Sequence, residues 1–487
     1  MNNNIFSSMM WRFGERIGAQ LVTFVVSIVL ARIISPSDYG IVTLVLVFTS
    51  ILQVFVDSGL GNALIQKKDV DNIDYSTVFF VNLVFCLILY WILFLVSPII
   101  SSFYADPSMS LYIRVLGLTI VISGLKNIQQ AYVSRNMLFR KFFFSTIGGT
   151  IISAIVGVTM AYAGFGVWAL ISQQLANVLI DTLILWVTVP WRPNLVFSFV
   201  RLRCLFNYGW RLLGSALIDA AYLNLSSLVI GKIYSTSDLS YYNQGDKFPK
   251  LLVTNINTSI DSVLFPALSI EQDNKKRMKE ITKRMIKIST YIMTPLMIGM
   301  AVCSKSLVAL LLTEKWIPCV RFIQAFCLMY MLYPLHTANL NAIKALGRSD
   351  LCLRMEFKKK AIGMLILFVT MNISVEIMAL GMVINSVIGL IINISPNRKL
   401  LDYGYKEQLL DILPAILLAV FMGIVVYPIQ LLGYSYFVTL LMQCFVGFVV
   451  YVLGSIIFHI DSFEYLINIA KPYFYKLTKI KRRSDKK

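Results

Sequence analysis

Charged residues are scarce in this chain. They make up 14% of its 487 residues, and hydrophobic residues make up 57%, whereas a soluble domain usually carries about a quarter charged residues. Polar linkers that would separate soluble domains are also missing, because apolar segments of membrane-spanning length recur from Trp11 almost to His459. The composition therefore argues against a soluble fold and predicts that the whole chain is a membrane domain.

Residues that hold metals or form disulfides are sparse and scattered. The seven cysteines include no CxxC pair, and most lie in apolar segments, where cysteine behaves as a small hydrophobic residue. The two histidines, His336 and His459, have no second histidine or carboxylate at ligand spacing. We therefore expect no disulfide framework, no metal site and no cofactor.

A cleavable signal is another feature that the sequence lacks. The chain begins Met1-Asn2-Asn3-Asn4, without a basic region, and runs directly into a long apolar segment. We expect this first helix to be retained in the mature protein.

Basic residues exceed acidic ones, and the formal net charge is +19. A nucleic-acid-binding protein would present such a charge on one face of a soluble domain. Here the lysines and arginines fall between the apolar segments instead, where they indicate membrane topology. We expect no nucleic-acid partner.

Fourteen segments are apolar and long enough to cross a membrane as helices of about 20 residues. Their approximate limits are 11–34, 39–66, 76–100, 111–134, 142–163, 165–189, 204–231, 239–268, 286–312, 319–346, 359–375, 378–396, 409–428 and 436–458. The sequence thus predicts an all-α, polytopic membrane protein with about 14 transmembrane helices.

Alternate connections between these spans differ in charge. One set carries most of the basic residues: Lys67 and Lys68; Arg135, Arg140 and Lys141; Arg192, Arg201 and Arg203; the run from Lys275 to Lys287; the run from Arg348 to Lys360; Arg398, Lys399 and Lys406; and the C-terminal tail. Cytoplasmic loops hold the excess of Lys and Arg. This set therefore predicts the cytoplasmic loops of a multi-pass protein of the inner (cytoplasmic) membrane, with both termini in the cytoplasm. The outward loops are short and leave little room for a catalytic domain.

One segment recurs 200 positions later in the chain. Ser27 to Asp38 reads SIVLARIISPSD and Ser227 to Asp238 reads SLVIGKIYSTSD, with six of twelve positions identical. Six spans separate the two copies, so both enter the membrane in the same direction and the repeats are parallel. We expect two six-helix bundles around a central cleft, then two further helices and a basic cytoplasmic tail, with limits of 1–200, 201–400, 401–460 and 461–487.

A series of motifs resembles the polysaccharide exporters of the MOP superfamily. The motifs are LARIISPSDYGIVTLVLVF (30–48), DSGLGNALIQ (57–66), GVWALISQQL (166–175), SYYNQGDKFPKL (240–251), SVLFPALS (262–269) and LLTEKWIPCVRFIQ (311–324). The resemblance is to the Wzx-like branch, which includes lipopolysaccharide and teichuronic acid exporters. It implies a two-bundle fold shared with MATE multidrug exporters and lipid II flippases. It also implies that the chain carries an undecaprenyl-diphosphate-linked oligosaccharide to the outer leaflet by alternating access, with membrane lipid and other polysaccharide-assembly proteins as partners.

Ionisable residues are concentrated in the first, second, seventh and eighth spans, while the third, fifth, eleventh and fourteenth contain essentially none. An ionisable group in hydrocarbon costs roughly 2.5–3.5 kcal/mol on insertion scales, so such groups usually face a cavity or a partner. We therefore expect the first two helices of each repeat to line the cleft. The eighth span carries a polar stripe with the spacing of one helical face: Asn243, Lys247, Lys250, Thr254, Asn257 and Asp261.

These in-span residues are candidates for binding an anionic substrate. A diphosphate entering a low-dielectric cleft needs cationic partners. The candidates are Arg12, Arg16 and Arg211 nearer the cytoplasm, Lys247 and Lys250 deeper in the membrane, and the amides Asn243 and Asn257. The carboxylates Asp57, Asp219 and Asp261 are candidates for coupling transport to an ion, H⁺ or Na⁺. A structural alternative stays open, in which Arg12, Glu15 and Arg16 pair within one helix or the arginines only snorkel to the surface.

Three classes of function remain. They are a lipid-linked oligosaccharide flippase, a multidrug or small-solute antiporter on the same fold, and a membrane enzyme of polysaccharide assembly. The enzyme would need a long outward loop bearing Arg or His, and the sequence contains none, so no catalytic residue is expected. The density of cationic residues in the first, seventh and eighth spans suits an anionic substrate better than a cationic drug, which favours the flippase.

Overall fold

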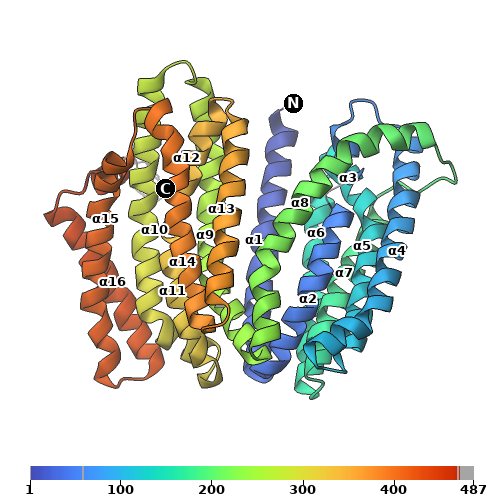
Figure 1. Cartoon of the computed structure of the whole chain (residues 1–487), viewed down its shortest axis with the longest axis horizontal. Coiled ribbons are helices and arrows are strands. Elements are labelled where there is room, and N and C mark those ends of the chain that lie inside the picture. The colour runs from blue at the N-terminus through green and yellow to red at the C-terminus, as the bar shows by residue number, and fades with distance from the viewer. Residues whose placement is uncertain (1, 58–59, 469–470, 472–487) are drawn as a thin grey trace, which may run out of the picture. The chain divides into compact units, whose positions relative to one another are not determined.

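The structure is a computed structural model that describes residues 2–57, 60–468 and 471, apart from the side chains of residues 2–6, 8, 9, 60, 62, 204–209, 211 and 212. Within these residues the chain is helical and contains no strand, which confirms the predicted all-α fold (Figure 1). The chain divides into two compact units, Met1–Ser240 and Tyr241–Lys487. The bundle limits that the sequence repeat suggests, 1–200 and 201–400, stay a prediction.

Unit 1 contains eight helices in its described part, and most of them are long enough to cross the hydrocarbon core of a membrane, about 30 Å thick. They are α1 (Asn2–Ile33), α2 (Pro36–Asp57), α3 (Leu60–Gln66), α4 (Asn72–Tyr104), α5 (Met109–Arg135), α6 (Phe139–Tyr162), α7 (Val167–Thr188) and α8 (Phe199–Ile233). The next helix, α9 (Thr236–Ile270), begins at the end of unit 1 and continues into unit 2.

Unit 2 is built from α9 and the helices that follow it. These are α10 (Lys275–Leu311), η1 (Glu314–Cys319), α11 (Val320–Tyr330), α12 (Tyr333–Ala345), α13 (Ser349–Thr370), α14 (Val375–Leu400), α15 (Tyr405–Val426), η2 (Tyr427–Leu432) and α16 (Tyr436–Ile457). The span predicted at 319–346 is thus formed by two short helices, α11 and α12, rather than by one, and η1 precedes them.

Thirteen helical segments of the described chain are long and apolar enough to cross a membrane, close to the predicted 14. The predicted span that does not qualify is 359–375, which lies in α13. α13 carries Asp350, Arg354, Glu356 and three consecutive lysines that end at Lys360, so only its last ten residues are free of charge. A segment of that length is too short to cross the hydrocarbon core by itself.

The repeated sequence has the same local structure in both copies. α1 ends at Ile33 and α2 begins at Pro36, while α8 ends at Ile233 and α9 begins at Thr236. In the first copy the Asp38 N–H donates to Ser35 Oγ at 3.2 Å, and in the second copy the Asp238 N–H donates to Ser235 Oγ at 3.0 Å. A serine that accepts from an N–H three residues later caps the start of a helix. The wider prediction, that residues 11–190 superpose on 211–390, stays a prediction.

Helices in unit 1 pack closely where small residues lie between them. α6 packs against both α1 and α7, and α5 packs against α2, α4 and α7. At Gly149 of α6, a Cβ atom would lie 3.1 Å from the Asn177 carbonyl oxygen and 3.2 Å from Asp181 Cβ of α7. Hydrocarbon gives no hydrophobic driving force between helices, so close packing at small residues supplies much of the association energy. This approach fixes the position of Asp181 within the unit.

The end of unit 1 that contains the α3–α4 loop is held by polar contacts. Arg135, at the end of α5, donates to the carbonyl oxygens of Leu64, Lys67 and Lys68. Asp71 caps α4 in a capping box with Asp74 and accepts a hydrogen bond from Arg201 of α8. This bond to the guanidinium lowers the pKa of the Asp71 carboxyl to about 2. The loop is therefore tied to α5 and α8, and it closes one end of the unit.

Candidate functional site

A polar cavity of about 380 Å³ lies inside unit 1 and is lined by five helices, α1, α2, α3, α5 and α6. Its lining residues are Arg12, Glu15, Gln53, Asp57, Gly61, Ile65, Lys126, Asn127, Gln130, Ala131, Ser134, Phe142 and Thr146. Two of the residues that the sequence marks as candidates, Arg12 and Asp57, therefore line the same cavity. Polar walls inside a membrane bundle are typical of a water-filled pathway or of a binding site.

Arg12 lies in this cavity in contact with an acidic partner and two aromatic rings. Its Nη1 is 2.6 Å from Glu15 Oε2, and its guanidinium carbon lies 5.0 Å from the centre of the Phe142 ring. The Thr146 hydroxyl donates to the other oxygen of Glu15 at 3.2 Å. Part of the structural alternative is thus realised, since Arg12 and Glu15 form an ion pair within one helix. Arg16 is exposed, and no ion pair is found for it in the described part of the chain.

Asp57 is the last residue of α2 and lies at the wall of the cavity. The Gln53 amide donates to Asp57 Oδ1 at 3.0 Å. Nearby, the Asn127 amide of α5 donates to the carbonyl oxygen of Val56 at 2.9 Å, which ties the end of α2 to α5. A Cβ atom at Gly61 would lie 2.6 Å from Asn127 Oδ1, so a larger residue here would have to displace the Asn127 amide. The end of α2 and the start of α3 are therefore both held against α5.

An ion pair that the sequence analysis missed lies next to Asp57. Lys126 of α5 is 2.7 Å from Asp181 of α7, and the two side chains are only 16% and 11% exposed. Lys126 lines the cavity. Within the described residues the second oxygen of Asp181 is buried and accepts no hydrogen bond. The sequence could have pointed to this pair, because Asp181 is the only charged residue of the predicted span 165–189 and a lone charge in a membrane span needs a partner.

In unit 2 the two lysines of the polar stripe on α9 lie close in sequence to a carboxylate, Asp246. Asp246 accepts from the Tyr330 hydroxyl at 2.6 Å and pairs with Lys250 at 3.2 Å. The Lys250 side chain is 62% exposed. Lys247 is half-buried, and no carboxylate pairs with it in those parts of the chain that the structure describes. Lys247 is therefore the more costly of the two cations to hold in a membrane helix, which is the usual mark of a functional charge.

The other candidates of the sequence analysis lie along α8 and α9. Asn243 and Asn257 are half-buried, and Asn257 Oδ1 has no hydrogen-bond partner within the described residues. Asp261 is exposed and accepts from the Asn341 amide at 2.6 Å, and Asp219 is exposed on α8. The side chain of Arg211 lies outside the described residues. The convergence of the candidate cations on one central cleft stays a prediction.

Other reactive groups form no further candidate site. In the part of the chain that the structure describes, no cluster of His, Cys, Asp and Glu has the size of a metal site. The described cysteines are all unpaired. His336, which the sequence analysis treats as structural, lies between Ser386 and Asn393 of α14 at 3.4 and 2.9 Å.

The fold defines a multi-pass helical membrane protein, and its charges within the spans lie where such proteins have their functional sites. The family described as "Polysaccharide biosynthesis protein" matches residues 29–321, more than half of the sequence. The chain therefore belongs to this family. The resemblance to the polysaccharide exporters of the MOP superfamily is confirmed.

Curated relatives are similar over much of the chain. The teichuronic acid biosynthesis protein TuaB of Bacillus subtilis (strain 168) is 26% identical over 62% of this chain and 63% of its own length. The succinoglycan biosynthesis transport protein ExoT of Rhizobium meliloti (strain 1021) is 23% identical over 63% of this chain, which spans 62% of that relative. The lipopolysaccharide biosynthesis protein WzxC of Escherichia coli (strain K12) is 23% identical over 82% of this chain and 83% of its own length.

Solved structures show the same fold at lower identity. A lipid II flippase MurJ in an inward closed conformation matches with a TM-score of 0.71 and 16% identity, over 94% of this chain and 99% of its own. An inward-facing multidrug transporter of the MATE family matches with a TM-score of 0.63 and 14% identity, over 79% of this chain and 94% of its own. These likenesses identify the fold and leave the substrate to be argued from the site.

Proposed function

We propose that this protein is a flippase that moves an undecaprenyl-diphosphate-linked oligosaccharide from the cytoplasmic to the outer leaflet by alternating access. The product would serve the synthesis of a surface polysaccharide such as O-antigen, capsule or teichuronic acid. One observation carries the proposal: two cationic side chains lie within membrane spans, Arg12 at a polar cavity and Lys247 half-buried on α9. The chain also belongs to a family of polysaccharide biosynthesis proteins. A diphosphate leaving the headgroup region needs such cations as partners.

Binding would begin at the arginines and continue at the lysines. Arg12, Arg16 and Arg211 would capture the diphosphate near the cytoplasmic surface, and Lys247 and Lys250, with Asn243 and Asn257, would receive it deeper. Glu15 would make Arg12 selective for strongly charged anions. Its carboxylate is 2.6 Å from the guanidinium, so a substrate must compete with this ion pair to bind Arg12. The phosphate would have to displace this ion pair.

We place the protein in the inner (cytoplasmic) membrane with both termini in the cytoplasm. The loops rich in Lys and Arg support this orientation. One of them, which contains Lys67 and Lys68, is bonded through its backbone to Arg135 at the end of α5. Both of these basic connections therefore lie at the same end of unit 1, as a single cytoplasmic face requires.

Coupling to H⁺ or Na⁺ is proposed to use the carboxylates Asp57, Asp219 and Asp261. Asp57 has the strongest support, because it lines a polar cavity that also contains Lys126. A cation that enters this cavity would be attracted by Asp57 and repelled by Lys126. The protein would act as a transporter without a cofactor, next to other proteins of polysaccharide assembly.

A multidrug antiporter is the second candidate, because a MATE transporter has the same fold with a TM-score of 0.63. Such a protein would export cationic drugs, whereas the half-buried Lys247 would repel them. The similarity to the succinoglycan biosynthesis transport protein ExoT also favours the flippase over a membrane enzyme of polysaccharide assembly.

The experiment that tests the proposal is flipping of lipid-linked oligosaccharide by the protein reconstituted in vesicles. Arg12→Gln, Arg211→Gln and Lys247→Gln should each abolish flipping, while Arg211→Lys should keep part of it because the charge survives without its planar fork. Arg321→Gln is the matched control, since Arg321 is 75% exposed and pairs with Glu376. Wild-type flipping in all the cationic variants would show that these residues do not bind the diphosphate. Absence of flipping by the wild-type protein would contradict the flippase, and drug efflux by the same vesicles would favour the antiporter.

A further inference from the structure

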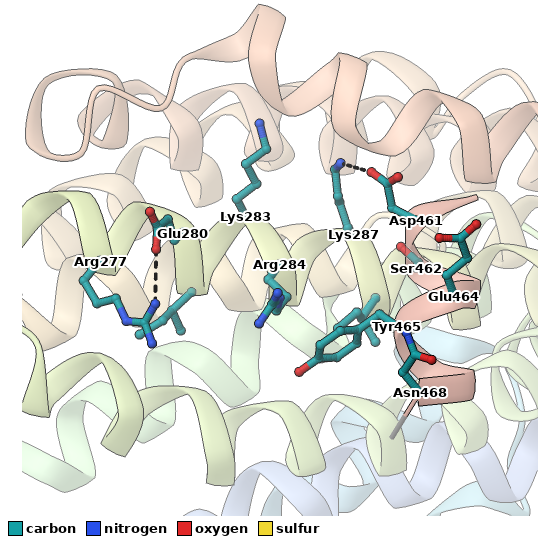
Figure 2. A pocket seen from close by; sticks show the side chains of 12 residues that line it. Arg277, Glu280, Lys283, Arg284, Lys287, Asp461, Ser462, Glu464, Tyr465 and Asn468 are labelled. Carbon is teal, nitrogen blue, oxygen red and sulfur yellow. Dashed lines mark hydrogen bonds and ion pairs between the residues drawn. The ribbon is translucent and has the colours of Figure 1, made fainter. Parts of the chain in front are cut away.

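A second pocket, of about 560 Å³, lies in unit 2 and plays no part in the proposed transport. One wall is the start of α10, and the other is the helical segment that follows α16, residues 461–468 (Figure 2). A volume of this size falls in the range of about 300–1,000 Å³ in which proteins bind small ligands.

Basic residues occupy one face of the α10 wall. Arg277, Lys283, Arg284 and Lys287 all line the pocket. Most of them already have acidic partners: Arg277 with Glu280 at 3.2 Å, Lys283 with Glu407 at 3.1 Å, and Lys287 with Asp461 at 2.9 Å. Figure 2 shows two of these pairs as dashed lines.

Arg284 is different from its neighbours. It forms no ion pair with any carboxylate among the residues described. Its guanidinium carbon lies 4.4 Å from the centre of the Tyr465 ring, and in Figure 2 it lies between Arg277 and Tyr465. A guanidinium stacked on an aromatic ring keeps the N–H groups at its edge free to donate in a fixed fork, which matches two oxygens of a phosphate. The pocket therefore holds an anion-binding group with its orientation already fixed.

The position of the pocket along the spanning helices indicates the source of the anion. The basic turns of α10 end at Lys287, and the same helix then continues to Leu311 as a largely apolar span in which Lys305 is the one charged residue. The opposite wall follows directly on α16, another spanning helix, which ends at Ile457. Ile281 and Ile288 also line the pocket. A site at the junction of polar and apolar helix, with cations and aliphatic side chains together, lies at the level of lipid headgroups.

We propose that this pocket binds the phosphate headgroup of an anionic membrane lipid, with Arg284 as the main donor. The phosphate oxygens accept from the edge of the Arg284 guanidinium while the Tyr465 ring covers its face. Asn468 lies on the same wall as Tyr465 and lines the pocket. An acyl chain would leave the pocket along the apolar part of α10. This lipid site is separate from the proposed transport path, so either can fail without the other.

Native mass spectrometry of the full chain in a mild detergent tests the proposal, with phosphatidylglycerol as the anionic probe and phosphatidylcholine as the zwitterionic one. Wild-type protein should retain phosphatidylglycerol in preference to phosphatidylcholine. Arg284→Gln should weaken phosphatidylglycerol binding by roughly fivefold, the effect of one basic residue near a membrane surface. Arg321→Gln, which removes an equal charge from an exposed position of α11, should leave it unchanged.

Two further variants cover the case in which Arg284→Gln does not fold. Arg284→Lys keeps the charge and loses the fork, and Tyr465→Leu keeps the charge and loses the stacked ring, so both should weaken phosphatidylglycerol binding less than Arg284→Gln. Equal retention of phosphatidylglycerol by wild type and all these variants would overturn the proposal. Displacement of the lipid by millimolar inorganic phosphate would overturn it too, because the site would then take free phosphate rather than a lipid headgroup.

Discussion

Lys126 and Asp181 are 55 positions apart in the sequence, and their side chains meet at 2.7 Å between α5 and α7. Both are largely buried, and Lys126 also faces the cavity that contains Asp57. A buried ion pair is weak evidence for net stability, whereas the removal of one partner leaves a charge without compensation. Substitutions of this pair therefore test whether the contact between α5 and α7 stabilises unit 1.

Lys126→Met should lower the free energy of unfolding by about 3–5 kcal/mol, because it leaves the Asp181 carboxylate buried without its cation. Asp181→Leu should have a similar cost. In the double variant Lys126→Met/Asp181→Leu, the loss in free energy of unfolding should be much smaller than the sum of the losses in the two single variants. Thermal unfolding of the purified protein in detergent measures all three. Additive losses would show that the two side chains do not interact.

Gly61→Ala should destabilise the protein by about 1–3 kcal/mol, the usual cost of overpacking. The new Cβ would lie 2.6 Å from Asn127 Oδ1, and the Asn127 amide is held by its bond to the Val56 carbonyl oxygen. The same substitution in an Asn127→Ala background should cost little. Gly214→Ala is the matched control, since no atom lies within 4 Å of its Cβ position. An equal effect of Gly61→Ala in both backgrounds would contradict the clash.

Asp57→Asn should change how transport depends on pH or on sodium, because it removes the carboxylate charge from the polar cavity. Asp261→Asn should act in the same way if both carboxylates couple to ions. Flipping assays in vesicles with imposed proton or sodium gradients provide the measurement. Asp106→Asn is the control, since this half-buried carboxylate lies in the α4–α5 loop, outside the polar cavity, and accepts from Ser108. Unchanged gradient dependence in Asp57→Asn would remove this residue from the coupling mechanism.

Asp71→Asn should lower stability at pH 7 by up to about 1 kcal/mol, the value of an exposed ion pair, while it keeps a side chain that can cap α4. The folded pKa of Asp71 is lowered from 3.8 to about 2 by its bond to Arg201. Its contribution is therefore fully present above pH 3.8 and is lost as the pH falls through 2. Melting temperatures of wild type and variant should converge between pH 4 and pH 2. A gap of constant size across this range would contradict the assignment.

Single cysteines placed at Ser237 and at Lys68 should label from opposite sides of the membrane. The distribution of basic residues predicts that Ser237 faces outward and Lys68 the cytoplasm. An impermeant thiol reagent applied to intact cells or to inverted vesicles separates the two cases. Labelling at Ser237 from the cytoplasmic side alone would overturn both the orientation and the parallel repeat.

The sequence by itself determined the membrane class, the approximate spans and the capped turns at Ser35 and Ser235. These features depend on local properties of the chain: mean hydropathy over about 20 residues, the spacing of basic residues, and side chains that bond to a backbone N–H three positions away. The Arg12–Glu15 pair belongs to the same group, since residues three apart lie on one face of a helix.

Only the tertiary structure decided which polar residues of different helices meet. The sequence marks Arg12 and Asp57 as charges within spans, but their position at one cavity depends on how α1, α2 and α5 are rotated and tilted against one another. The same is true of Lys126 with Asp181 and of Arg284 with Tyr465. Hydrophobic periodicity identifies the face that a helix buries, and it carries no information on which neighbour that face meets, because many helix pairings bury the same apolar area.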